Sequence, residues 1–281
     1  MSKIILSAFA DEYDEKFEEQ LRGLCELGIK YMEIRGVGGK NISTLSSTEV
    51  DEVKTVLNAY GVGVSAIGSP IGKIKLDGDL DAHLEMSKRV FDTANKLGAK
   101  YIRIFSFYAP EGKSILDCKE KVFAELDRLA AAAKEQGVVL CHENEALIYG
   151  DVPTRCREIL DAFSSDIRCV FDMGNFALDG IDPYPAYHLL RDRISYFHIK
   201  DALAAGAIVP PGKGEAKIEK ILSDHVKYAK EDFFISLEPH LQLFSGLNSL
   251  AGRRFDNPYK YNDMKEAFID ALTKLKELLP Q

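Results

Sequence analysis

Four apolar segments in the second half of the sequence each end on a side chain that can bind a metal ion. The segments are VVLCHEN at residues 138–144, IRCVFDM at 167–173, ISYFHIK at 194–200 and FFISLEP at 233–239. Their candidate ligands are Glu143, Asp172, His198 and Glu238. Carboxylates that gather near one point repel one another and raise their own pKa values unless a cation neutralises them. If these residues meet, a divalent metal ion would resolve the repulsion.

Three carboxylate oxygens and one imidazole nitrogen form a mostly hard ligand set. This set favours Mn²⁺ or Mg²⁺, with Co²⁺ and Zn²⁺ as alternatives. In an octahedral ion, four protein ligands leave two neighbouring positions free, which suit the adjacent oxygens of an aldose, a ketose or an inosose. The metal would polarise the carbonyl while a carboxylate removes the neighbouring proton, which gives a metal-stabilised enediolate. Re-protonation elsewhere gives isomerisation or epimerisation, whereas loss of a β-hydroxyl gives dehydration.

The elements that must position these residues alternate along the whole chain. Four further strands are expected at 4–9, 31–36, 63–68 and 101–107, which makes eight in all. Amphipathic helical patterns occupy 14–28, 47–61, 80–98 and 119–137, and each closes on a glycine, as helix C-termini favour. Helix-then-strand alternation implies parallel strands with crossover helices. Eight such units predict an α/β fold, a (β/α)₈ TIM barrel that occupies residues 1–281 as one domain.

Side-chain parity brings the four candidate ligands to one end of this barrel. In a barrel strand, alternate residues point inward and the others face the helices. With Phe197 and Ile199 facing the helices, His198 and Lys200 face the interior near the C-terminal rim. The same parity turns the three carboxylates inward at the ends of their own strands. Active sites of this fold lie at the C-terminal rim.

Four short motifs carry a resemblance to a known group of proteins. They are Glu143-Asn144, Asp172-Met-Gly-Asn175, His198-Ile-Lys200-Asp201 and Glu238-Pro239. In this order and at these intervals they resemble the xylose isomerase-like TIM-barrel superfamily, the sugar phosphate isomerase/epimerase group that also holds ketose 3-epimerases, inosose dehydratase and endonuclease IV. The resemblance covers nearly the whole chain. It implies that the four candidate ligands bind the metal, and that Glu143 and Glu238 are also the catalytic acid/base pair on opposite faces of the sugar.

This sequence differs from two members of that superfamily at residues that their active sites use. Ketose 3-epimerases carry a His three residues after the strand-six Asp and an Arg six residues after the strand-seven His, where this chain has Asn175 and Ala204. A plain assignment as a ketose 3-epimerase is therefore not favoured. Endonuclease IV builds a three-metal site with additional His residues on strands three, four and six, and the corresponding segments here contain none. This difference and the acidic charge argue against a DNA-repair nuclease.

Further residues are candidates for substrate binding, namely Glu33, Arg103, Asn175 and Lys200. Glu33, Arg103 and also Arg35, which shares the parity of Glu33 in its strand, can hydrogen-bond sugar hydroxyls from the rim. The alternative is an internal ion pair between Glu33 and Arg103. Lys200 can steady a developing oxyanion, or pair with Asp201 or Glu143. His188 and His240 are expected at the surface, with the mouth of the pocket as the alternative.

Size and charge exclude several partners. The 281 residues carry a net charge of −8 without a block of Lys or Arg, which argues against nucleic acid. No apolar run approaches the roughly 20 residues that span a bilayer, and the first residues lack the pattern of a secretory signal. Five scattered cysteines without CxxC spacing fit a reducing cytoplasm. We therefore expect a cytoplasmic protein that binds a small sugar or polyol, touches no membrane and can form a homo-oligomer.

One connection is longer than this fold usually needs. Residues 241–262 lie between the last strand and the last helix. The segment is a decorated loop, a contact between subunits or a cover over the active site.

These observations predict a divalent-metal-dependent isomerase or epimerase of a small sugar or ketose. The nearest alternative is a lyase, a metal-dependent dehydratase of an inosose-like polyol ketone. A third alternative is a barrel that keeps the site as a non-catalytic module for binding metal and sugar.

Overall fold

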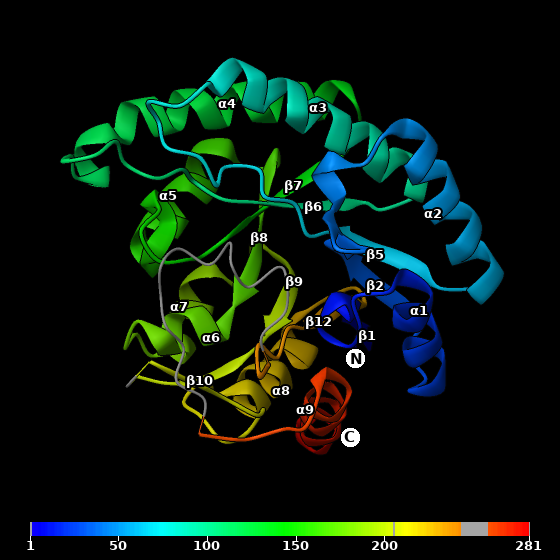
Figure 1. The fold of residues 1–281 in the computed structure, drawn as a ribbon. Coiled ribbons are helices and arrows are strands. Elements are labelled where there is room, and N and C mark those ends of the chain that lie inside the picture. The colour runs from blue at the N-terminus through cyan, green and yellow to red at the C-terminus, as the bar shows by residue number, and fades with distance from the viewer. Residues whose placement is uncertain (1, 205, 243–257, 281) are drawn as a thin grey trace.

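The computed structural model describes residues 2–204, 206–242 and 258–280, and a barrel of parallel strands lies at its centre (Figure 1). The eight strands are β1 (Ile4–Ala8), β2 (Tyr31–Ile34), β5 (Gly63–Ile67), β6 (Tyr101–Ile104), β7 (Val139–Glu143), β8 (Ile167–Asp172), β9 (Ile194–Ile199) and β12 (Phe233–Leu237). They form one parallel sheet in the order β1-β12-β9-β8-β7-β6-β5-β2. Because β1 and β2 also contact each other, the sheet curls into a nearly closed barrel. The predicted TIM barrel is confirmed, and all eight strands lie where the sequence placed them.

Helices surround this barrel as an outer ring (Figure 1). They are α1 (Phe17–Glu26), α2 (Ser47–Tyr60), α3 (Leu80–Leu97), α4 (Lys119–Glu135), α5 (Pro153–Phe163), α6 (Met173–Leu178), α7 (Pro183–Leu190), α8 (Ile218–Tyr228) and α9 (Met264–Leu278). Local sequence explains their ends. A capping box between Ser46 and Glu49 starts α2, and Gly61 at φ +66° ends it. Gly98 ends α3 at φ +74° in the same way, since glycine has no Cβ to clash in this left-handed conformation.

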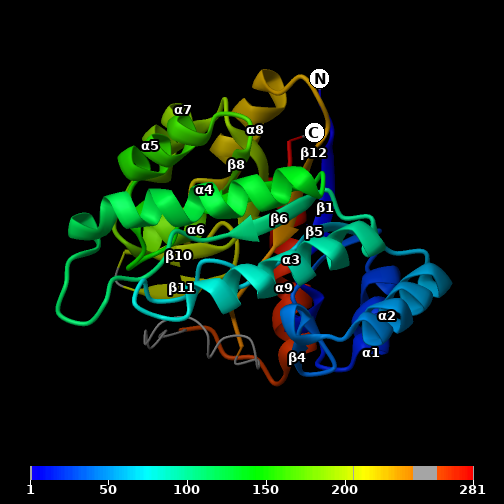
Figure 2. The same ribbon diagram turned by 90° about the horizontal axis from the view of Figure 1, so that it is seen from above.

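Short elements decorate the carboxyl ends of the strands. They are the hairpin of β3 (Gly36–Val37) and β4 (Lys40–Asn41), the hairpin of β10 (Asp201–Leu203) and β11 (Ala207–Val209), and the 3₁₀ turns η1 (Ala10–Glu12), η2 (Ile42–Thr44), η3 (Ile115–Cys118) and η4 (Tyr149–Asp151). Figure 2 shows β4, β10 and β11 at the end of the barrel away from the two chain termini. The candidate ligands lie at this same end, where the strands finish.

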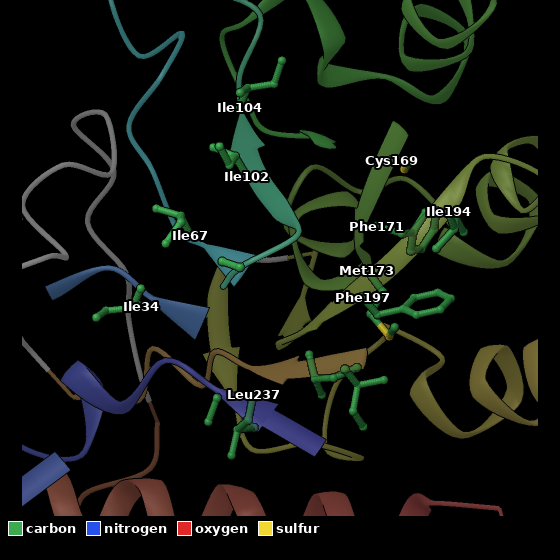
Figure 3. Close-up of a cluster of buried hydrophobic side chains, with 14 of the residues drawn as sticks. Ile34, Ile67, Ile102, Ile104, Cys169, Phe171, Met173, Ile194, Phe197 and Leu237 are labelled. Atoms are coloured by element: carbon green, nitrogen blue, oxygen red, sulfur yellow. The ribbon is translucent and has the colours of Figure 1, made fainter. Parts of the chain in front are cut away.

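Two apolar layers stabilise the barrel and fix the direction of its side chains. The larger layer lies between strands and helices and takes alternate residues near the carboxyl ends of the strands, as Phe171 of β8 and Phe197 of β9 show (Figure 3). The smaller layer fills the barrel with Ala66, Cys141, Val170 and Tyr196. Each large apolar side chain that leaves water contributes about 1.5–3 kcal/mol, so a one-residue slip of a strand would be costly. Asp172 and His198, one residue on from these phenylalanines, must therefore point inward.

Two expectations concern segments outside the barrel itself. The long connection at 241–262 falls largely outside the described residues, which break at 243–257. Within the described ranges, none of the helices has both the length and the apolarity that a membrane span requires.

Candidate metal centre

The four predicted ligands meet at the carboxyl end of the barrel. Glu143 ends β7, Asp172 ends β8, His198 lies in β9 and Glu238 follows β12. Asp172 lies directly opposite His198 in the parallel register of β8 and β9. One ligand atom from each of the four residues lies within 4.8 Å of the others, and all four side chains are buried. The inward parity predicted for each of them is the parity observed.

His198 is held on both sides of its ring. Its Nδ1 lies 3.1 Å from Glu143 Oε1 and 3.6 Å from Glu238 Oε2, so this nitrogen faces the centre. Its Nε2 lies 3.0 Å from Glu33 Oε2, and the other oxygen of Glu33 accepts a hydrogen bond from Tyr196. Burial opposes a charge on His198, but Glu33 and Glu143 outweigh it and raise the pKa of the imidazole to about 10.

Glu33 therefore has a different position from the one expected. Its carboxylate is fully buried beneath His198, with one oxygen engaged by the imidazole and the other by Tyr196, so it does not line the rim. A carboxylate behind a histidine fixes the tautomer and orientation of a metal-binding imidazole. The alternative ion pair between Glu33 and Arg103 is not formed either. Arg103 Nη1 instead lies 3.2 Å from Glu143 Oε2 and 3.6 Å from Glu238 Oε1.

Asp172 is fixed by its neighbours on two elements. Its Oδ1 accepts a hydrogen bond from the Asn175 backbone and so caps the first turn of α6. Asn144, which follows β7, exchanges two hydrogen bonds with the Asp172 backbone, at 2.8 and 3.0 Å. The Asn175 amide donates to Glu143 Oε1 at 3.3 Å and to the Asn144 carbonyl at 2.9 Å. Asn175 thus ties α6 to Glu143, at the edge of the centre.

Lys200 enters the centre itself. Its Nζ lies 2.8 Å from Asp172 Oδ2 and 3.3 Å from Glu238 Oε2, and the side chain is almost fully buried. The expected partners Asp201 and Glu143 are not the ones it uses. The Asp201 carboxylate turns away and accepts backbone N–H bonds from Ala202, Gly212, Gly214 and Ala216. The loop at 210–216 is therefore pinned beside Lys200.

A second layer of charged residues surrounds the four candidate ligands, and it uses Arg35 in an ion-pair network that was not expected. Arg35 follows β2, and its guanidinium binds both oxygens of Asp11 at 2.9 Å and Glu238 Oε1 at 2.8 Å. Glu12 lies beside it at 3.0 Å and accepts the backbone N–H of His240 at 2.7 Å. His240 is buried, so its predicted surface position is wrong. Asp11 and Glu12, which follow β1 after Phe9 and Ala10, were not singled out from the sequence.

The charges around the centre do not balance within the described residues. Six buried carboxylates meet three buried cations there, namely Asp11, Glu12, Glu33, Glu143, Asp172 and Glu238 against Arg35, Arg103 and Lys200. With every carboxylate ionised and every imidazole neutral, as metal binding requires, this is a formal charge of −3. Without a metal, the protons held by His198 and Glu12, whose pKa values are raised to about 10 and about 8, offset part of that charge. The chain's own cations thus relieve part of the repulsion, and the remaining negative charge fits one divalent ion held by three carboxylates and an imidazole.

A neighbouring acidic group fits a second ion less well. Atoms of Glu12, Glu238 and His240 also lie within 4.8 Å of one another. The Arg35 guanidinium already contacts two of these residues, at 3.0 Å from Glu12 and 2.8 Å from Glu238. This group also offers three ligands where the first centre offers four, and it shares Glu238 with that centre. The donor set therefore favours one metal position.

Burial and neighbouring charges shift the pKa values of the three candidate carboxylate ligands in different directions. Burial alone would raise the pKa of Glu143, but His198 and Arg103 outweigh it and lower the pKa to about 2. Burial acts the same way on Glu238, where Lys200 and His240 hold the pKa well below its ordinary value. For Asp172, burial outweighs Lys200 and raises the pKa to about 7. Glu143 and Glu238 are therefore ionised at neutral pH.

Comparisons with known proteins agree with this architecture. A family model described as xylose isomerase-like TIM barrel matches residues 21–243. A search among curated proteins gives no significant match. Many solved structures share the fold, and the identities of the three described next are too low to show more than the fold.

The first is D-allulose 3-epimerase from Methylomonas sp. in complex with D-allulose, with a TM-score of 0.76 and 16% identity over 99% of this chain and 98% of that chain. The second is the probable 3-DHS dehydratase involved in petrobactin synthesis from Bacillus anthracis, with a TM-score of 0.72 and 16% identity over 99% and 98% of the two chains. The third is a xylose isomerase-like TIM barrel protein from Mycobacterium smegmatis in complex with magnesium, with a TM-score of 0.69 and 16% identity over 100% and 98%.

Proposed function

Because the chain belongs to the xylose isomerase-like TIM barrel family, we propose that it is a divalent-metal-dependent enzyme that isomerises or epimerises a small sugar or ketose. Relatives of the same fold include an epimerase crystallised with D-allulose and a protein crystallised with magnesium. The proposed metal ligands are Glu143, Asp172, His198 and Glu238. Mn²⁺ and Mg²⁺ suit this donor set best.

The metal ion, when bound, would polarise a substrate carbonyl and acidify the neighbouring C–H group. Glu143 and Glu238 exchange the proton at that carbon. Arg103 lies between these two carboxylates and orients both through its Nη1. Glu33 holds the His198 ring so that Nδ1 faces the centre. Lys200 balances Asp172 and Glu238 and is placed to donate to a substrate oxygen.

The observation that carries the proposal is the arrangement of Glu143 and Glu238. The two carboxylates come from β7 and from the end of β12, which are separated in the sheet by β8 and β9. Both reach His198 Nδ1, at 3.1 and 3.6 Å, and both have a pKa below the ordinary value. Two ionised carboxylates from separate strands thus meet at one centre, and in this proposal they exchange protons with the two faces of a sugar.

The test is solvent-deuterium exchange with the metal-loaded protein. A set of ketoses and inososes is incubated in D₂O, and label at the carbon next to the carbonyl is measured by NMR. We expect exchange in at least one ketose, and a loss of about 10²-fold or more in E143Q and E238Q. E219Q, on the exposed face of α8, is the matched control and should keep the wild-type rate. Saturable sugar binding without exchange in any substrate would show a binding module and contradict the proposal.

A dehydratase is the second candidate, and Asn175 favours it. Ketose 3-epimerases have a histidine at this place, whereas the Asn175 amide here donates to Glu143 and carries no titrating group. A probable 3-DHS dehydratase also shares the fold. The same exchange experiment separates the two reactions, because a lyase releases water from an inosose and leaves an unsaturated product, while an isomerase keeps every oxygen.

A further inference from the structure

A pocket opens at the barrel end opposite the metal centre. Its volume is about 740 Å³, and it lies where β6, β7, β8, β9 and β12 begin, beside the end of α8. In this fold the amino end of the barrel usually carries stabilising contacts rather than a ligand site. The charges that line this pocket differ from that expectation.

The pocket is lined by cationic side chains that form no ion pair with a carboxylate of the described residues. Lys100, Arg168, Arg191 and Lys230 line it, and within the described part of the chain none of them lies within 4.0 Å of an acidic oxygen. The acidic residues in its wall are Asp192, Glu231 and Asp232. Asp192 is paired with Arg157 and Arg193, and Asp232 accepts the Lys3 backbone N–H. The wall thus holds four cations and three carboxylates, and in a chain of net charge −8 it is unexpected that none of these four cations forms an ion pair within the described residues.

Arg168 is the residue most in need of an anion. It is the second residue of β8 and shares the inward parity of Val170 and Asp172, so it points into the lower end of the barrel. Its side chain is half-buried, and its two hydrogen bonds are long, 3.5 Å to Ser195 Oγ and 3.4 Å to the Asp192 carbonyl. Both partners are neutral. Withdrawing a guanidinium from water costs free energy unless a charge compensates it, and its fork geometry matches phosphate.

We propose that this pocket binds a small phosphorylated organic molecule, with its phosphate on Arg168 and Arg191. The pocket is much larger than a phosphate ion, and Tyr101 and Tyr228 supply apolar surface beside the cations. Pockets of this size usually bind a molecule with an organic part. The site is independent of the proposed reaction, since it lies at the other end of the barrel and uses none of the metal ligands.

The test is calorimetric titration of the full metal-free chain at physiological salt with three probes, ribose 5-phosphate, inorganic phosphate and ribose. We expect saturable binding of ribose 5-phosphate, weaker binding of inorganic phosphate and none of ribose. R168Q should weaken ribose 5-phosphate binding at least about 10-fold, since a hydrogen bond to a charged group contributes about 1.5–3 kcal/mol. R89Q makes the same change of charge on the exposed face of α3 and should bind as the wild type does.

Several results would overturn the proposal. For the wild type, these results are no binding of ribose 5-phosphate, or binding of ribose or inorganic phosphate as tight as that of ribose 5-phosphate. For the variants, they are an R168Q protein that binds ribose 5-phosphate less than about 10-fold more weakly than the wild type, or an R89Q protein that binds it differently from the wild type. Thermal unfolding checks that R168Q is folded, and R191Q replaces it if it is not. Neither metal nor turnover enters this titration, so its failure is distinct from failure of the proposed enzyme activity.

Discussion

His198 lies between Glu143, a proposed metal ligand, and Glu33, the carboxylate that holds the other side of its ring. Glu33 and Glu143 together raise the pKa of its imidazole to about 10 in the metal-free protein, against the ordinary value of 6.5. A metal-bound imidazole must be neutral at the coordinating nitrogen. The imidazole of His198 must therefore lose a proton before it can bind a metal ion.

We predict that metal binding releases about one proton from His198 at pH 8. The measurement is calorimetric Mn²⁺ titration in two buffers of different ionisation enthalpy, which gives the number of protons released. E33Q removes one of the two charges that raise the pKa, so it should release fewer protons. Equal heats in both buffers for the wild type would show that His198 is neutral before the metal binds or is not a ligand.

Lys200 places a buried ammonium group beside two of the proposed metal ligands. Its ammonium lies against Asp172 and Glu238, so replacing it by methionine leaves two buried carboxylates without their partner. Breaking a buried ion pair typically costs about 3–5 kcal/mol. The same change removes a positive charge that repels an incoming metal ion.

K200M is therefore expected to unfold at lower urea concentration with EDTA and to bind Mn²⁺ more tightly than the wild type. Urea unfolding with and without Mn²⁺ measures both effects. K73M is the matched control, because Lys73 forms a buried pair with Glu145 at 2.8 Å outside the four ligands. K73M should lose stability without gaining metal affinity. A K200M protein with unchanged metal affinity would place the metal away from Lys200.

At the scale of elements, the loop at 210–216 depends on one carboxylate. Asp201 starts β10 and accepts four backbone N–H bonds, three of them from this loop at 2.8 to 3.0 Å. Gly214 allows this approach, because a Cβ there would lie 2.3 Å from Asp201 Oδ1. The loop is thus built around the residue that follows Lys200.

D201A should lower the free energy of unfolding by about 3 kcal/mol, since several N–H groups lose a charged acceptor at once. D79A is the comparison, because Asp79 caps α3 through a single bond at 2.9 Å and its loss should cost about 1 kcal/mol. Urea unfolding of both variants measures the difference. Equal losses would mean that the loop holds its shape without Asp201.

The elements were predictable from sequence to a greater extent than the contacts between them. Period-two and period-3.6 patterns reflect the local backbone, and so they located the eight strands, the first four helices and the inward direction of His198. Ion-pair partners depend on the stagger between strands, which no local pattern encodes. Arg103 reaches Glu143 instead of Glu33, and Lys200 reaches Asp172 instead of Asp201. Arg35 was missed as a partner of Glu238 because their strands are far apart in sequence.

At the scale of the whole molecule, the buried ionisable groups of the candidate metal centre make the free energy of unfolding depend on pH. The pKa of His198 is raised to about 10, that of Asp172 to about 7 and that of Glu12 to about 8, the last two mainly by burial. Each folded group thus holds its proton to a higher pH than the unfolded chain does. Stability linked to His198 is complete below pH 6.5 and is lost as the pH rises toward 10.

Metal-free protein should therefore become less stable between pH 6.5 and 9, by about 3 kcal/mol from His198 alone. Urea unfolding in EDTA across this range measures the slope. H198Q should flatten it, while H188Q, on the exposed part of α7, should leave it unchanged. Saturating Mn²⁺ should reverse the trend, because the metal binds the deprotonated ligands. Wild-type stability that rises with pH in EDTA would contradict the charge arrangement described here.

The most direct test of the account is a crystal structure of the protein grown with MnCl₂, with an anomalous difference map at the manganese edge. We predict one strong peak within about 2.3 Å of an atom from each of Glu143, Asp172, His198 and Glu238. A map without a peak there, in which Lys200 and Arg103 still hold the carboxylates, would contradict the central claim.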